Sequence, residues 1–109
     1  MRIEVTAVNL RLPDVQRGKL VRIVLLSLSR FAPRIRKVTV RLAQPANPLG
    51  GVDQRCRMRA SLRESDHIRT EAIDGGIEAA VALAAARLAK RLDSALDGAA
   101  RPPSFPRTR

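Results

Sequence analysis

Aromatic residues, cysteine and histidine are almost missing from this chain, and acidic residues are scarce. There is no Trp or Tyr, and the two Phe residues are Phe31 and Phe105, so the core must consist mainly of aliphatic side chains and alanine. The shortage of aromatic rings also argues against proteins that stack single-stranded bases on a sheet. A single cysteine excludes an internal disulfide and is compatible with a reducing cytoplasm.

Few side chains are available for catalysis or metal binding. His67, the only histidine, is expected at the edge of a turn, and Cys56 falls on the buried face of a predicted strand, where a thiol acts as a small hydrophobe. Together they cannot supply the four ligands of a zinc site. The glycine pairs at 50–51 and 75–76 lack the spacing and the lysine of a nucleotide-binding loop. We therefore expect a protein that is not an enzyme and that uses no cofactor or metal.

Long apolar runs and targeting segments are also missing. The longest apolar run, residues 79–86, is far shorter than the ~20 residues that a membrane helix needs. The N-terminus begins a strand pattern at once, with no secretory signal. The sequence therefore predicts a cytoplasmic protein without a membrane partner.

Basic residues dominate the charged residues of the sequence. The 21 Lys and Arg residues outnumber the 10 Asp and Glu residues, which gives a formal net charge of +11. Such an excess favours a polyanionic partner over a protein that is merely soluble and basic. Of the two common polyanions, nucleic acid and an acidic membrane surface, we expect nucleic acid.

Two periodicities divide the chain into strands and helices. Alternation of apolar and polar residues predicts four strands, from residue 3 up to residue 12, at 35–42, at 55–62 and at 68–74. Helical spacing predicts two helices, at 15–31 and 77–96. A loop is predicted at 44–53. The order β-α-β-β-β-α predicts an α+β two-layer sandwich, a four-stranded sheet with two helices on one face. This domain is expected over residues 1–97, followed by a disordered basic tail over 98–109.

The third and fourth predicted strands form a hairpin whose pairing can be predicted from the pattern. A three-residue loop at 64–66 places Leu62 beside Ile68, so that the apolar faces match. The same register sets Arg59 opposite Glu71 on the outer face, which is a favourable cross-strand pair.

Basic residues gather on two predicted surfaces. The first is the outer sheet face, with Lys37, Arg41, Arg55, Arg57, Arg59 and Arg69. The second is the last helix, where Arg87, Lys90 and Arg91 project away from the apolar stripe. A solvated polar face is one interpretation, because any open sheet face needs polar residues. The shortage of acidic neighbours favours the other, which is binding of structured RNA through phosphate and shape.

Three segments resemble a known family. They are 3–9 (Ile-Glu-Val-Thr-Ala-Val-Asn), 31–40 (Phe-Ala-Pro-Arg-Ile, then Val-Thr-Val) and 79–92, which ends in Arg-Leu-Ala-Lys-Arg-Leu. In order and spacing, they resemble the short-form ribosome hibernation-promoting factors and ribosome-associated translation inhibitors. The resemblance spans Met1 to about Leu96, and it implies the same β-α-β-β-β-α fold.

The resemblance also implies a partner and a set of contacts. Members bind the small ribosomal subunit in the channel of messenger and transfer RNA, and so silence idle ribosomes under stress. Carried over by position, the contacts with ribosomal RNA fall on Arg22, Arg87, Lys90 and Arg91. The chain departs from the family at Ile23, Leu26 and Ser29, where members carry further basic residues, and at Glu78, Ala82 and Ala86 in the last helix.

A second hypothesis starts from the first predicted helix. Its apolar residues cover more of the helix circumference than a surface helix should have. Leu25 and Leu26 do not fit its core-facing side and could contact another protein or a second copy of the chain. The alternative function is therefore a dimerising interaction module that keeps the fold without binding ribosomes.

Overall fold

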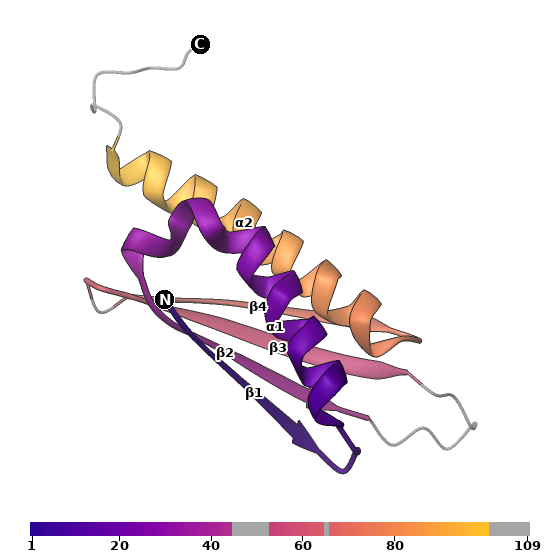
Figure 1. Ribbon diagram of the computed structural model, residues 1–109. Coiled ribbons are helices and arrows are strands. Elements are labelled where there is room, and N and C mark those ends of the chain that lie inside the picture. The colour runs from indigo at the N-terminus through magenta and orange to yellow at the C-terminus, as the bar shows by residue number, and fades with distance from the viewer. Residues whose placement is uncertain (45–52, 65, 101–109) are drawn as a thin grey trace.

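The computed structural model describes residues 1–44, 53–64 and 66–100. Its elements are β1 (Arg2–Val8), α1 (Asp14–Leu28), the 3-10 helix η1 (Ser29–Arg34), β2 (Ile35–Ala43), β3 (Gln54–Leu62), β4 (His67–Asp74) and α2 (Ile77–Ala100). The strands form one sheet in the order β1-β2-β3-β4, and both helices cover the same face of it (Figure 1). The predicted α+β sandwich is therefore confirmed. Most of the predicted loop at 44–53 lies outside the described residues.

The sheet is mixed because its first two strands are joined by a helix. β1 and β2 run parallel, whereas β2, β3 and β4 pair antiparallel. β1 ends at Val8 instead of continuing toward Leu12, since Asn9 adopts a left-handed conformation with φ of 57° that breaks the extended backbone.

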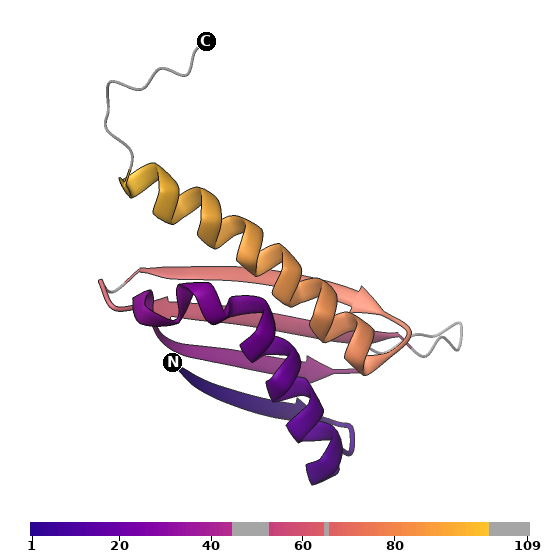
Figure 2. The ribbon, with the colours of Figure 1, turned by 45° about the horizontal axis from the view of Figure 1, so that its top comes forward.

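The core lies between the sheet and the two helices. α1 contributes Leu20, Val24 and Leu28, and it ends at Leu28, earlier than the predicted residue 31. The chain then tightens into η1, which contains Pro33 and buries Phe31. In α2, the apolar stripe predicted over residues 77–96 is confirmed at five buried residues, Val81, Ala84, Ala85, Leu88 and Leu92. Ile77 and Leu96, the two ends of the predicted stripe, are half-buried. α2 runs diagonally over the sheet and extends past its end (Figure 2), as far as Ala100 and thus beyond residue 97.

The predicted hairpin register is wrong by two residues. The backbone N–H of Leu62 donates to the carbonyl of Asp66 at 2.8 Å, so the turn comes one residue earlier than predicted. Arg59 therefore lies opposite Arg69, and Glu71 lies opposite Arg57. The two apolar faces still match, because a shift of two residues leaves every side chain on its original face.

β2 contains a bulge near its start. Ile35 pairs with Leu62, whereas Lys37 pairs with Ser61, so Arg36 is the additional residue in β2. Ile35 and Val38 are both buried although they are three positions apart, and the two basic residues between them stay out of the core. The bulge thus interrupts the alternation of faces at one end of the sheet.

Candidate RNA-binding surface

The sheet face that no helix covers carries two adjacent rows of side chains with an excess of positive charge. One row crosses β2, β3 and β4 through Thr39, Arg59 and Arg69. The next row crosses the same strands through Arg41, Arg57 and Glu71. Each row therefore contains two arginines at directly opposite positions of neighbouring strands.

Acidic residues compensate only part of this charge. Glu71 binds Arg55 at 2.8 Å and Arg57 at 3.9 Å. Glu4 on β1 binds Arg2 at 3.5 Å and Lys37 at 3.6 Å. Within the described part of the chain, three further arginines of this face form no ion pair: Arg41, Arg59 and Arg69.

A broad open hollow of about 860 Å³ runs along these rows and reaches the helix layer at the β4 edge. Its lining includes Thr6, Thr39, Thr70 and Glu71, together with Arg41, Arg57, Arg59, Arg69 and Arg91. We call these five arginines the basic sheet surface. Arg91 belongs to α2, so the hollow joins the two basic regions that the sequence predicted separately.

Two arginines of α2 reach the β4 edge through hydrogen bonds. Arg87 donates to the carbonyl of Glu71 at 2.8 Å, and Arg91 donates to the carbonyl of Arg69 at 3.1 Å. Both side chains are exposed, and neither forms a salt bridge among the described residues. The two bonds satisfy carbonyl groups that an edge strand would otherwise leave free, and they leave other N–H groups of each guanidinium available.

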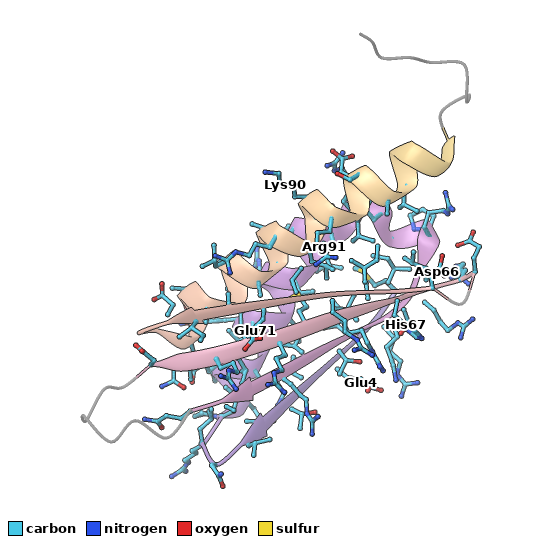
Figure 3. All side chains as sticks on the ribbon, turned by 180° about the vertical axis from the view of Figure 1, so that it is seen from behind. Glu4, Asp66, His67, Glu71, Lys90 and Arg91 are labelled. Carbon is cyan, nitrogen blue, oxygen red and sulfur yellow. The ribbon has the colours of Figure 1, made fainter. Side chains whose placement is uncertain are left out.

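The remaining predicted contacts lie apart from this edge. Lys90 projects from α2 away from the sheet, whereas Arg91 lies between the helix and β4 (Figure 3). Arg22 is exposed and comes two residues after buried Leu20, which turns it to the opposite side of α1, away from the core. The structure therefore brings Arg91 together with the sheet arginines but does not bring Arg22 to them.

The exposed side of α1 is apolar as well as basic. Leu25 is 46% exposed and Leu26 is 68% exposed, as the alternative hypothesis expects. Among the described residues, no helix is long and apolar enough to span a membrane.

Cys56 is buried, whereas His67 is exposed at the edge of the sheet. Burial raises the pKa of the Cys56 thiol from 9.0 to about 12, which keeps it protonated near neutral pH. His67 Nδ1 lies 3.2 Å from Ser61 Oγ, a hydrogen bond across the β3–β4 pair. No group of three potential metal ligands occurs among the described residues.

Sequence reasoning overlooked Arg2 and Arg36 as members of the basic outer face. Both line a smaller hollow at the end of the sheet that contains the β2 bulge. The spacing of Ile35 and Val38 was the available signal, because two buried residues three positions apart in a strand imply an interrupted alternation.

Comparison with solved structures defines the class of fold to which this surface belongs. No protein-family model matches the sequence, and no curated protein sequence is significantly similar to it. Two solved structures nevertheless superpose over most of the chain. Both are members of the hibernation-promoting factor family that the sequence resembles.

The first is the N-terminal domain of Protein Y from Thermus thermophilus, with a TM-score of 0.70, 21% identity, and coverage of 86% of this chain and 98% of that one. The second is a ribosomal subunit interface protein from Coxiella burnetii, with a TM-score of 0.68, 16% identity, and coverage of 88% of this chain and 98% of that one. At these identities the likeness establishes a shared fold.

Proposed function

We propose that the protein is a non-enzymatic, cytoplasmic, ribosome-associated factor that binds RNA of the small subunit and thereby inhibits translation under stress. The observation that carries the proposal is the basic sheet surface, which holds five arginines with one carboxylate in the same hollow. The same fold occurs in a protein described as a ribosomal subunit interface protein, which supports a ribosomal partner.

Electrostatics favour a phosphate backbone as the target of this surface. Arginines that face each other without acidic partners repel one another, and a polyanion placed over them removes that repulsion. Guanidinium groups bind phosphate oxygens in bidentate geometry, so a rigid array of them selects for the spacing of phosphates in folded RNA. The described residues offer no exposed aromatic ring on this face for stacking unpaired bases.

Inhibition would be steric in this proposal. A domain anchored on small-subunit RNA occupies space that messenger RNA and transfer RNA need, and no chemical step is required. Affinity then depends on salt concentration, because each phosphate that the protein neutralises releases a counterion.

Co-sedimentation with small ribosomal subunits over a series of salt concentrations tests the proposal. The variant Arg59→Ala/Arg69→Ala removes two arginines that form no ion pair, so it should retain the fold and weaken binding. We expect affinity to fall at least tenfold, and the slope of log K against log[salt] to decrease by about 1 for each lost phosphate contact.

The matched control is Arg11→Ala/Lys19→Ala, which removes two positive charges from exposed positions outside the basic sheet surface. It should bind within about threefold of the wild type, because at physiological salt the Debye length is only about 8 Å. Equal losses in the two variants would show that net charge alone drives binding. A free duplex RNA that binds as tightly as ribosomes would instead indicate a general binder of double-stranded RNA.

The exposed α1 leucines favour a second candidate function, a module that pairs with itself or another protein. Light scattering during size-exclusion chromatography distinguishes the two. A stable dimer that Leu25→Lys and Leu26→Lys disrupt, together with no sedimentation on ribosomes, would support this alternative. A monomer that sediments with small subunits would support the ribosomal one.

A further inference from the structure

A second, smaller hollow of about 480 Å³ lies on the open sheet face, at the end near the hairpin turn. Its polar lining consists of Arg2, Arg36, Lys37, Arg59, Ser61 and His67. We call it the bulge hollow. Among the described residues, no acidic side chain lines it, although Glu4 borders it through its ion pairs with Arg2 and Lys37.

The bulge of β2 is what creates this concentration of charge. In a regular strand, two consecutive residues point to opposite faces, so Arg36 and Lys37 could not line one hollow. The additional residue in β2 shifts the register between Ile35 and Lys37, and both basic side chains now line the same space. Bulges commonly redirect a side chain toward a site in this way.

The charge balance of the bulge hollow selects the ligand. Four cationic side chains line it, and Glu4, which forms ion pairs with two of them, offsets a single charge, so an excess of three remains. A phosphodiester carries only one negative charge. A terminal phosphate monoester carries close to two at neutral pH, and pyrophosphate carries more. The excess therefore matches a highly charged phosphate better than a backbone phosphate.

Two further lining residues, Ser61 and His67, supply hydrogen-bonding groups. Ser61 is buried to 8% exposure, and its hydroxyl bonds His67 Nδ1 at 3.2 Å. His67 itself is exposed and lines the hollow together with Ser61. Figure 3 shows His67 and Glu4 on the side of the sheet away from the helices, where a ligand can approach without moving either helix.

We propose that the bulge hollow is a binding site for one highly charged phosphate group, a phosphate monoester or a pyrophosphate. Arg36 and Lys37 are the residues that distinguish it from the rest of the basic face. The ligand is either the phosphorylated end of an RNA chain or a free phosphorylated small molecule. This site goes beyond the proposed ribosomal function, because its occupation is measurable in the absence of ribosomes.

His67 provides a direct readout, since it is the only histidine in the chain and its ring protons give one set of NMR signals. The full-length protein is titrated with inorganic pyrophosphate at fixed pH and ionic strength. We expect saturable shifts of the His67 signals, and at least tenfold weaker binding in Arg36→Ala/Lys37→Ala. Binding of a 5′-phosphorylated RNA tetranucleotide should exceed that of the same oligonucleotide without the phosphate.

The matched control is Arg41→Ala/Arg57→Ala, which removes two charges from the same sheet face but outside the bulge hollow. It should weaken pyrophosphate binding less than threefold. The proposal is wrong if the His67 signals show no saturable shift beyond that caused by chloride at equal ionic strength. It is equally wrong if both double variants lose the same affinity, because binding would then be diffuse.

Sedimentation of the Arg36→Ala/Lys37→Ala variant with small subunits distinguishes the two sources of the ligand. Loss of both pyrophosphate binding and sedimentation assigns the hollow to an RNA end. Loss of pyrophosphate binding with unchanged sedimentation assigns it to a free phosphorylated molecule. If the wild type does not sediment with ribosomes, the proposed function fails while the pyrophosphate titration still tests this site.

Discussion

Arg59 of β3 and Arg69 of β4 lie directly opposite each other on the open face of the sheet, with no acidic partner for either among the described residues. Like charges at directly opposite positions destabilise a sheet. Arg41 and Arg57 repeat the arrangement between β2 and β3, although Glu71 partly offsets the charge of Arg57. Folding therefore brings together positive charges that a bound polyanion would stabilise.

Replacing Arg69 by threonine should make the protein more stable. Threonine removes the repulsion with Arg59 and suits an exposed strand position, so the free energy of unfolding should rise by about 0.5 kcal/mol. Urea unfolding measures this change. Arg55→Thr is the control, because Arg55 pairs with Glu71 at 2.8 Å and its loss should not stabilise the sheet. A decrease in stability for Arg69→Thr would contradict the repulsion argument.

Arg91→Ala and Lys90→Ala should differ in their effect on stability, although the two residues are neighbours on α2. Arg91 donates a hydrogen bond to the carbonyl of Arg69, so its loss should lower the free energy of unfolding by about 0.5 kcal/mol. This value is at the low end for a hydrogen bond, because the bond is exposed and water can replace it. Lys90 projects away from the sheet, and its loss should leave stability unchanged. Thermal or urea unfolding checks both values. Equal effects of the two substitutions would show that the hydrogen bond of Arg91 does not stabilise the protein.

Gly18→Ala should stabilise the protein by about 0.5–1 kcal/mol. Gly18 lies within α1, and a Cβ built there meets nothing within 4 Å, so alanine adds helix propensity without a clash. Urea unfolding with an unchanged m-value gives the difference. A destabilised variant would indicate that the exposed side of α1 is covered in solution, for instance by a second copy of the chain.

Cys56 should resist thiol reagents in the folded protein. With its pKa raised to about 12, the thiolate fraction at pH 8 is roughly a thousandfold lower than for a thiol with the ordinary value of 9.0. We expect a slow reaction with a disulfide reagent under native conditions and a fast one in urea. Rapid native labelling would show that β3 opens readily.

The same thiol should make stability depend on alkaline pH. The folded state keeps the proton to a higher pH than the unfolded state, so the stabilisation is complete below pH 9 and is lost as the pH rises from 9 toward 12. The loss is about 1.4 kcal/mol per pH unit in that range. Comparison with Cys56→Ala isolates this effect, because the variant should lack the additional slope while sharing all other titrations.

The order of elements, the faces of β3 and β4 and the apolar stripe of α2 were decided by the sequence alone. Period-two alternation in β3 and 3.6-residue spacing in α2 place the buried side chains of each element on one side, and burial of that side favours a two-layer arrangement. The resemblance to hibernation-promoting factors was visible in three short segments, which lie mainly in β1, in η1 and β2, and in α2. The basic outer face followed for the same reason, since charges occupy the positions that the core excludes.

Tertiary structure alone decided which charged residues meet. Alternation cannot distinguish two registers that differ by two residues, so only the packed sheet places Arg69 rather than Glu71 opposite Arg59. The bulge at Arg36 and the approach of Arg91 to the β4 edge depend on how the strands pair and how α2 crosses them. These contacts join residues far apart in the chain, and the local pattern around each residue carries no information about its distant partner.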